Sequence, residues 1–521
     1  MLVFRWTSPK KMSMKSAVTL VFSFIFQATV WGAVTLDAKD GDSVMLESDP
    51  AMKNIGKPKK GSPAAAAITA FQDGEYEEGV ALATPLAAAG NADAIYLLGF
   101  AHETGQGAKL SPQKAAEYYE KSLLKGHADS IYRLSLLLMV SENQADLRRA
   151  QEILEERAIE DPMVAGRILG EAFLRGLLTE NPAPESAISW WKKAAEAGDI
   201  ASMNFLARFY EGQMGFPEKT DAAQALEFYR SAANEGDSSA MVNLASRLLA
   251  GDKKLRDEKK GREWIAKAIA VKEPAAYLAL GDYFEKEKKD LKSALAEYRK
   301  GAEADQVDSM LRAGILLAKG GEGIEKDNKR GTELLKKAAE AGSAQAHLEL
   351  AGMLLNKENP DVTGGYTYLL TAANGGLPFA QNELGILYLS GKLGAADVSA
   401  GLSWFGRAAQ ANFAPAQNNL AALHERGAGV PQNFENAIKL YALAAQQGHP
   451  GATLALARFH SVGAGIKQNK ELAWALAKIA EEHGETNAAE FITEIEKSLT
   501  KEQLASAKKQ LEKLKSGEKV E

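Results

Sequence analysis

Histidine is the residue type in this chain best suited to acid–base or metal chemistry, because the chain has no cysteine. Three of the seven histidines, His102, His424 and His460, recur at one position of a repeating sequence pattern. Equivalent positions elsewhere in the pattern hold Phe173, Tyr210, Leu248 and Tyr388. We therefore interpret these histidines as substitutes for a packing aromatic. A metal shared between repeats would also need carboxylate partners, which the pattern does not supply, so we predict no metal and no cofactor.

Asparagine recurs at a second position, where its amide could bind a peptide. Asn204, Asn382 and Asn418 occupy one position of the pattern, and Asn243 and Asn419 lie one residue further along. Asparagine is unfavourable inside a helix, so its recurrence there calls for a reason. Its amide can both donate to and accept from a peptide backbone. We predict that these five side chains bind an extended segment; the alternative is that they bond to a neighbouring repeat or turn.

The chain lacks the short motifs that mark common catalytic sites. It has no H-E-x-x-H zinc motif, no P-loop and no G-x-S-x-G elbow, and a thiol nucleophile is impossible without cysteine. We predict no catalytic residues and a protein that is not an enzyme. With 62 Lys and Arg against 68 Asp and Glu, the net charge of −6 disfavours nucleic acid as a partner.

A repeat of about 36 residues positions these side chains, and this period is typical of a stacked two-helix unit. Short motifs of the form AAEAG recur along the chain: AAEAG at 194–198 and 338–342, AANEG at 232–236, AANGG at 372–376 and AAQQG at 444–448. The last residue of each copy, with weaker copies filled in, defines an anchor in each repeat. The twelve anchors are Gly90, Gly126, Asp161, Gly198, Gly236, Lys272, Asp305, Gly342, Gly376, Asn412, Gly448 and Gly484. Gly or Asn at most anchors favours a left-handed residue that ends a helix.

The residue eleven positions before each anchor is Ala or Gly in every repeat. The twelve are Gly79, Ala115, Ala150, Ala187, Ala225, Gly261, Ala294, Gly331, Gly365, Gly401, Ala437 and Ala473. This restriction indicates a close contact between two helices, where a larger side chain would overpack. Large residues lie eight and seven positions before the anchor, as in Trp190 and Trp191. Together with the small position, they have the i, i+3, i+4 spacing of one helix face, which predicts a helix that ends at the anchor; we call it helix B. A second periodic segment, helix A, precedes it.

A glycine-rich loop separates helix A from helix B. It reads GQGA at 105–108, GEGI at 321–324, GAGV at 427–430 and GAGI at 463–466. With this loop the units read approximately A-x-x-x-L-G-x-x-Y-x-x-G-x-G-V, then A-x-x-W/Y-x-x-x-A-A-x-x-G. The chain thus resembles the Sel-one-like repeat family of tetratricopeptide-like proteins over residues 64–485. Three units depart from the family pattern: 127–161, which lacks the glycine loop, 238–272, which is polar there, and 275–305, which is shortened.

The resemblance implies an all-α fold, an α/α superhelical solenoid of about twelve two-helix repeats with helices A on a concave face. It implies a non-catalytic scaffold or adaptor that binds an unidentified protein or peptide on that face, in envelope signalling or assembly. Some members of the family are connected with peptidoglycan or β-lactam chemistry. The alternative is therefore a cell-wall-active enzyme or a carbohydrate-binding protein.

Residues 1–32 have the pattern of a secretory signal peptide. A basic start with Arg5, Lys10, Lys11 and Lys15 leads into an apolar run over 17–32. Small residues at Val30 and Gly32 favour cleavage before Ala33. We predict a bacterial periplasmic or secreted protein with no membrane association after cleavage. The alternative is an uncleaved anchor, because the apolar run approaches the roughly 20 residues that span a bilayer.

The two ends of the repeat region are expected to differ from it. Residues 33–63, rich in Gly, Pro and Lys, read as a flexible leader. Residues 486–521 follow the last anchor and lack the repeat, and we predict a helical cap and tail there, with helices over 487–499 and 504–514. Thr500 and Gln503 have capping-box spacing at the start of the second helix. Stacked repeats need such polar ends.

Overall fold

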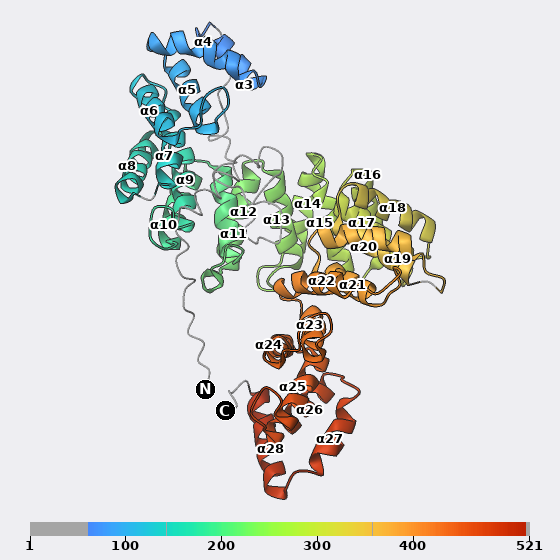
Figure 1. Ribbon diagram of the computed structural model, residues 1–521. Helices are drawn as coiled ribbons and strands as arrows, with labels where there is room; N and C mark the ends of the chain where they lie inside the picture. The colour runs from blue at the N-terminus through green and yellow to red at the C-terminus, as the bar shows by residue number, and fades with distance from the viewer. Residues whose placement is uncertain (1–60, 142, 357, 517–521) are drawn as a thin grey trace. The chain divides into compact units, whose positions relative to one another are not determined.

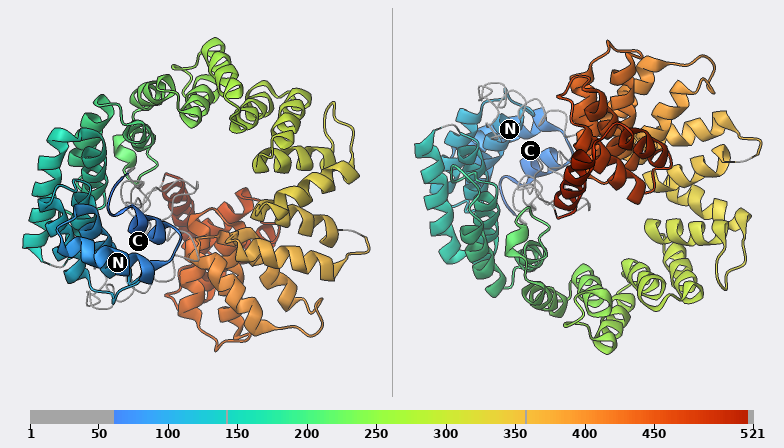
Figure 2. Two further views of the ribbon diagram at one scale, coloured as in Figure 1. Left: turned by 90° about the horizontal axis from the view of Figure 1, so that it is seen from above. Right: turned by 90° about the horizontal axis from the view of Figure 1, so that it is seen from below.

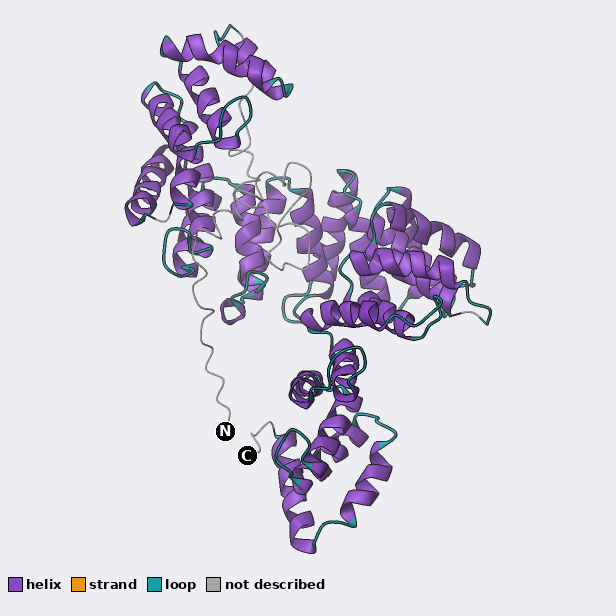
Figure 3. Ribbon diagram, in the orientation of Figure 1, coloured by secondary structure: helices purple, strands orange, loops and turns teal. Residues whose placement is uncertain are grey.

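The computed structural model describes residues 61–141, 143–356 and 358–516, and within these ranges the fold is all-α (Figures 1 and 3). The helices alternate between helix A and helix B of successive repeats. The helices A are α3 (Ala65–Gln72), α5 (Ala92–Thr104), α7 (Ser130–Met139), α9 (Pro162–Leu174), α11 (Ile200–Tyr210), α13 (Ser238–Ala250), α15 (Ala275–Tyr283), α17 (Val307–Lys319), α19 (Ala344–Leu355), α21 (Pro378–Leu389), α23 (Ala414–Arg426) and α25 (Pro450–Val462).

The helices B complete the twelve pairs. They are α4 (Tyr76–Ala88), α6 (Pro112–Leu124), α8 (Gln144–Glu160), α10 (Pro184–Glu196), α12 (Ala222–Asn234), α14 (Glu258–Ala270), α16 (Leu291–Glu303), α18 (Asn328–Glu340), α20 (Val362–Asn374), α22 (Val398–Gln410), α24 (Phe434–Gln446) and α26 (Lys470–Glu482). The predicted all-α solenoid of about twelve two-helix repeats is confirmed. The predicted signal peptide, 1–32, lies outside the described residues, as does the leader up to residue 60.

The chain divides into two compact units, with the division between Ala279 and Leu280 inside α15. The N-terminal unit contains α3 to α14 and the C-terminal unit contains α16 to α28. Within each unit, successive helices A and B pack side by side, which the two further views also show (Figure 2). Away from the division at α15, a helix B that is followed by another repeat in its unit contacts its own helix A and helix A of the next repeat, as α10 contacts α9 and α11. In the described residues, no helix is both long and apolar enough to cross a bilayer.

The small position of helix B is a close contact with helix A, as predicted. Its alanines, Ala115 and Ala437 among them, are at most 1 % exposed. Its glycines approach the neighbouring helix A so closely that a Cβ at Gly365 would lie 2.5 Å from Leu355 Cγ. A Cβ at Gly331 would lie 2.6 Å from the backbone nitrogen of Ala318. Any larger side chain at this position would therefore push the two helices apart.

The anchors adopt the left-handed conformation that ends helix B, with one exception. Even Lys272, Asp305 and Asn412 have φ angles of 61°, 57° and 57°. Asp161 has φ −129°, because it ends α8 and at the same time caps α9 by accepting from the backbone N–H of Val164. The chain passes directly from α8 into α9 at this point, and it needs no left-handed turn.

Two repeats have unusual loops between helix A and helix B, and each loop is stabilised in a different way. In 238–272, Arg256 donates to the carbonyl oxygens of Gly251 and Ala250 at 2.8 and 3.1 Å, which folds the polar stretch back on the end of α13. In 275–305, α15 continues into a π-helical turn, η3 (Phe284–Lys288), and Lys289 at φ 55° leads directly to the start of α16. This compact turn accounts for the shorter repeat.

Two further helices, α27 (Ala488–Glu496) and α28 (Lys501–Lys515), follow the last repeat and pack against α26. Ile492 of α27 and Leu511 of α28 share an apolar cluster with Trp474. The capping box predicted at Thr500 and Gln503 is confirmed, since both of its reciprocal hydrogen bonds are present. These helices cover the apolar side of α26 that another repeat would otherwise cover.

Candidate interaction surface on helices A

The five asparagines lie on helices A whose starting points are set by N-terminal caps or by proline. Asp199 accepts from the backbone N–H of Ser202 at 2.8 Å and begins α11, which carries Asn204. Asp237 begins α13, which carries Asn243, in the same way. In α21 and α23, proline in the first turn sets the helical φ angle where no side-chain cap is present. These starts determine which side chains lie on each face.

Asn382 and Asn419 bond to each other across two repeats. The side-chain amide of Asn419 on α23 donates to Asn382 Oδ1 on α21 at 2.9 Å. Asn382 Nδ2 donates to Glu383 Oε1 at 3.2 Å, and the Asn382 residue is only 4 % exposed. These two asparagines thus bond to a neighbouring repeat, which was the alternative to peptide binding. The pair therefore fixes α21 against α23.

The other three asparagines have freer side chains. Asn243 Oδ1 accepts a long hydrogen bond of 3.5 Å from Arg247 Nη1. The side-chain amides of Asn204 and Asn418 are half-buried and form no hydrogen bond with another described residue. Asn204 and Asn243 belong to the N-terminal unit, whereas the other three belong to the C-terminal unit. A role in peptide binding stays a prediction for all five, and Asn418 has the geometry best suited to it.

Two exposed apolar side chains lie on α21, the helix that the Asn382–Asn419 bond joins to α23, which carries Asn418. Phe379 and Ile386 of α21 are 50 % and 43 % exposed, and their spacing of seven residues places them on one face of the helix. The Phe379 ring packs edge-to-face on Phe413, with centroids 6.2 Å apart. Because the Asn382–Asn419 bond joins α21 to α23, these apolar groups and the Asn418 amide belong to adjoining helices. We call Phe379, Ile386 and Asn418 the A-face patch.

A pair of glutamines beside the asparagines was missed by the sequence interpretation. Gln381 and Gln417, both buried, donate to the carbonyl oxygens of Ala373 and Ala409 at 3.1 and 3.4 Å. Each glutamine thereby ties a helix A to the C-terminal end of the helix B that precedes it. The repeated triplet Ala-Gln-Asn at 380–382 and 416–418 was the available signal.

Tyrosine–glutamate pairs inside the repeats were also missed. Tyr119 of α6 donates to Glu103 of α5, and Arg133 of α7 approaches the same carboxylate at 2.9 Å. Burial, together with the Glu103 charge, raises the pKa of Tyr119, so the hydroxyl keeps its proton and serves as a donor. The tyrosine–glutamate bond recurs elsewhere between Tyr229 and Glu211, Tyr298 and Glu285, and Tyr441 and Glu425. These carboxylates hold helices together.

The recurring histidine position packs as an aromatic position. His102 stacks on Tyr118 with ring centroids 5.5 Å apart and an interplanar angle of 9°. Tyr210 stacks on Phe228 in the same way, at 5.9 Å and 1°. The interpretation of histidine as a packing aromatic is confirmed at His102. At His460 burial lowers the pKa, which favours a neutral ring. Among the described residues, no group of three or more His, Asp or Glu side chains is placed to hold a metal ion.

The repeats match a known family over more than half of the chain. The matched segments of the Sel1 repeat are 92–127, 167–199, 200–237, 238–270, 307–343, 378–413, 414–449 and 450–485. The chain belongs to the Sel1 repeat family. The matches include 238–270, one of the units predicted to depart from the pattern, so its polar loop is tolerated within the family.

Similarity to individual proteins is lower. The chain is 24 % identical over 230 residues to the chitin synthase regulator SKT5 of Saccharomyces cerevisiae, over 42 % of this chain and 32 % of that protein. It thus spans about a third of the length of this curated relative. Among solved structures it is similar to c5321, a protective antigen of uropathogenic Escherichia coli with an SLR fold (22 % identity, 83 % and 93 % of the two chains, TM-score 0.48). It is also similar to a Sel1 repeat protein of Oxalobacter formigenes (23 % identity, 62 % and 93 %, TM-score 0.44).

Proposed function

We propose that the protein is a non-catalytic, exported scaffold or adaptor that binds a partner protein or peptide on helices A, in envelope signalling or assembly. Sel1 repeat proteins typically serve protein–protein interaction. The observation that carries the proposal for this chain is the A-face patch: exposed apolar side chains on α21, and on α23 an amide without a hydrogen-bond partner in the described residues, on two helices that the Asn382–Asn419 bond joins. Interfaces combine these two elements, apolar anchors for affinity and polar groups for register.

Each member of the A-face patch has a separate part in this proposal. Phe379 and Ile386 supply apolar area whose burial by a partner is favourable. Asn418 can accept one backbone N–H and donate to one backbone C=O of an extended segment. The Asn382–Asn419 bond holds α21 and α23 in place, so the patch loses little freedom when it binds.

The binding test uses the mature chain to isolate a partner from an envelope extract. We expect Phe379→Asp and Asn418→Ala together to abolish recovery of one specific protein. The matched control is Leu443→Asp, which charges a comparably exposed leucine on helix B α24. Loss of the partner in the control, with retention in the A-face variant, would move the binding surface to helices B. Turnover of purified peptidoglycan that a single carboxylate change abolishes would replace the proposal by the cell-wall enzyme alternative.

The export part of the proposal rests on the signal pattern of residues 1–32. We expect the protein in the periplasmic or secreted fraction, with an N-terminus at Ala33 by mass spectrometry. A chain that stays in the membrane fraction with residues 1–32 intact would support the anchored alternative. A chain found whole in the cytoplasm would refute export and leave the binding proposal standing.

A further inference from the structure

Two large apolar side chains, on helices B α6 and α8, are almost fully exposed. Leu124 is 85 % exposed and Ile159 is 82 % exposed, the two largest values among the exposed large apolar side chains of the described residues. Both lie two residues before their anchors, in the last turn of their helices. In the other ten repeats this position holds a polar residue or alanine: Ala88, Glu196, Asn234, Ala270, Glu303, Glu340, Asn374, Gln410, Gln446 and Glu482. A single exposed apolar residue is ordinary, but two at one repeat position of adjoining helices form a patch.

The helices that carry this patch lie side by side in the N-terminal unit (Figure 1). Arg149 Nη2 of α8 lies 3.0 Å from Glu120 Oε1 of α6, and this exposed ion pair joins the two helices B. A third apolar side chain, Met163, is 39 % exposed and lies in the first turn of α9, directly after the end of α8. We call Leu124, Ile159 and Met163 the B-edge patch.

The charged residues beside the B-edge patch are sorted by helix. On α6, Lys121 lies three residues before the exposed leucine and Lys125 lies one residue after it. On α8, the same two repeat positions hold Glu156 and Glu160. The patch therefore has a basic half on α6 and an acidic half on α8.

These charges are available to a partner. Both lysines and Glu156 are exposed, and none of the three forms an ion pair with another described residue. Glu160 is 77 % exposed and shares its cation, Arg157, with Asp161. The acidic half thus keeps an excess of negative charge. A surface with one basic and one acidic half is complementary to a second copy of itself.

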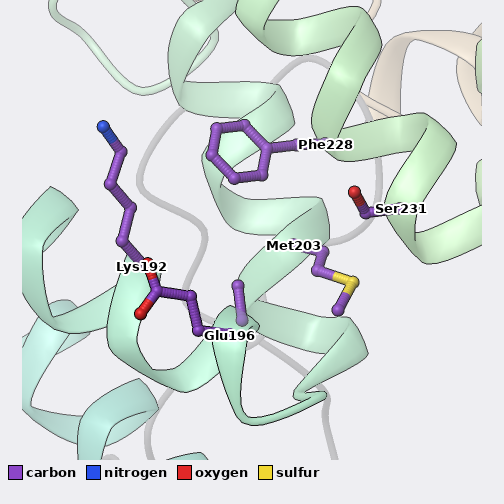
Figure 4. A pocket seen from close by; sticks show the side chains of 6 residues that line it. Lys192, Glu196, Met203, Phe228 and Ser231 are labelled. Atoms are coloured by element: carbon purple, nitrogen blue, oxygen red, sulfur yellow. The ribbon is translucent and has the colours of Figure 1, made fainter.

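A hollow of about 360 Å³ elsewhere in the N-terminal unit has no such sorting of charge (Figure 4). Met203 of α11 and Phe228 of α12 lie on its lining, together with Lys192 and Glu196 of α10. One cation and one anion on the same helix favour neither sign of partner. Charge therefore selects an occupant at the B-edge patch and not at the hollow.

We propose that the B-edge patch is a dimer contact whose occupant is a second copy of this chain. In a contact with twofold symmetry, each pair of contacting residues occurs twice, once in each direction. A half-turn about an axis between α6 and α8 places the α6 end of one copy on the α8 end of the other. Leu124 then meets Ile159 of the second copy. The two lysines beside Leu124 oppose the two glutamates beside that isoleucine.

Apolar burial drives this contact, and the charges select the antiparallel pairing. The twofold axis doubles the apolar area that leaves water, because both the leucine and the isoleucine of each copy are covered. A parallel pairing would instead place lysine against lysine and glutamate against glutamate, which is unfavourable. No residue of the A-face patch takes part, so this inference and the proposed function stand or fall separately.

Sedimentation equilibrium of the full chain measures the dimer. The average mass should rise toward twice that of the monomer as the concentration increases to about 100 µM, since a contact of this size is at the weak end of protein interfaces. Added salt should weaken the dimer, because exposed charges are screened. A chain that stays monomeric at that concentration overturns the proposal.

Charge reversal of one half at a time tests the pairing. Lys121→Glu with Lys125→Glu makes both halves acidic, whereas Glu156→Lys with Glu160→Lys makes both halves basic. Each variant alone should be monomeric, because like charges then face each other. An equal mixture of the two variants should recover the dimer, since an acidic half then faces a basic half at both contacts. If both variants keep the wild-type circular dichroism and their mixture stays monomeric, the assigned pairing is wrong.

The apolar contact is tested by Leu124→Gln with Ile159→Gln. Glutamine already occupies this position in two other repeats, so the fold should be kept. The dissociation constant of the dimer should rise at least about tenfold, because four apolar side chains per dimer are no longer buried. The control is Leu443→Gln, which changes an exposed leucine on helix B α24 and should dimerise as wild type. Equal dimerisation of the double variant and the control would overturn the proposal.

Discussion

In two regions of the molecule, a side chain at the same repeat position links neighbouring repeats, but one link is a charged pair and the other is a pair of amides. In the N-terminal unit, Arg133 of α7 lies seven residues after its anchor and pairs with Glu103 of α5 at 2.9 Å. In the C-terminal unit, Asn419 of α23 lies seven residues after its anchor and donates to Asn382 of α21 at 2.9 Å. Both links run between consecutive helices A. The repeat thus determines where the link is made, while the side chains determine its strength.

The two links differ in what they require of their surroundings. The Arg133 and Glu103 side chains are 9 % and 14 % exposed, so removing either one leaves an uncompensated charge in a poorly hydrated site. Burial alone would lower the pKa of Arg133, but the Glu103 charge together with the hydroxyls of Tyr119 and Tyr96 outweighs it, and the pKa is raised. The amide pair carries no net charge, and losing it costs only a hydrogen bond and some desolvation. We therefore expect the charged link to be the more sensitive to mutation.

The largest expected effect is at the charged link. Arg133→Ala should lower the free energy of unfolding by about 3–5 kcal/mol, because Glu103 would be left buried without its counter-charge. Urea denaturation and hydrogen exchange of α5–α7 would measure the loss. Arg149→Ala is the control, since it breaks an exposed pair with Glu120 on α6 and should cost at most about 1 kcal/mol. Equal losses in the two variants would show that the buried link carries no special weight.

The next effect concerns the small-residue contact that both regions share. Ala115→Leu and Ala437→Leu should each cost about 1–3 kcal/mol, because both alanines are fully buried against a helix A. Ala296→Leu, on the exposed side of α16, should be nearly neutral in the same urea denaturation. A neutral result at Ala437 would show that the repeat register is wrong there. Unequal costs at Ala115 and Ala437 would extend the difference between the regions to their apolar packing.

A smaller effect is expected at the amide link. Asn419→Ala should cost about 1 kcal/mol, since it removes the donor to a buried Asn382 oxygen. Asn418→Ala, one residue away and without a side-chain hydrogen bond in the described residues, should stay within about 0.5 kcal/mol. A double-mutant cycle with Asn382→Ala measures the coupling of the pair directly. Zero coupling would contradict the bond between the two repeats.

The smallest effect is a dependence on pH at the start of α25. His449 Nδ1 accepts from the backbone N–H of Ala452, which only an unprotonated nitrogen can do. Burial lowers the pKa of His449, so the folded state binds a proton less readily than the unfolded state. The free energy of unfolding should therefore fall as the pH drops below about 6.5, by less than about 1 kcal/mol, the usual worth of an N-terminal cap.

The test of this pH effect compares the melting temperature at about pH 7 and about pH 5. His449→Asn keeps a capping oxygen but cannot titrate, so it should lose part of the acid sensitivity. His483→Asn, at an exposed position, should behave as wild type. The same acid sensitivity in wild type and His449→Asn would exclude this histidine as the source.

The repeat architecture was predictable from the sequence because its signals are local. The left-handed anchors and the small residue eleven positions earlier lie within one helix and its turn, where helical spacing decides the face of each residue. Asp161 is the one anchor that is not left-handed, because it ends α8 and begins α9 at the same time. Of the candidate site, the position of the asparagines on helices A was predictable. Their bonding was not, since Asn382 and Asn418 share one repeat position, yet one is bonded and buried and the other is not.

The sequence by itself therefore determined the all-α class, the twelve-repeat register and the faces of each helix, because periodicity and backbone turns depend on residues close together in the chain. Only the tertiary structure decided that Asn419 bonds to Asn382, that Glu103 serves both Tyr119 and Arg133, and that Met203 and Phe228 enclose a hollow. These contacts join residues from different helices. They depend on side-chain rotamers and on the burial of both partners, which no local spacing specifies.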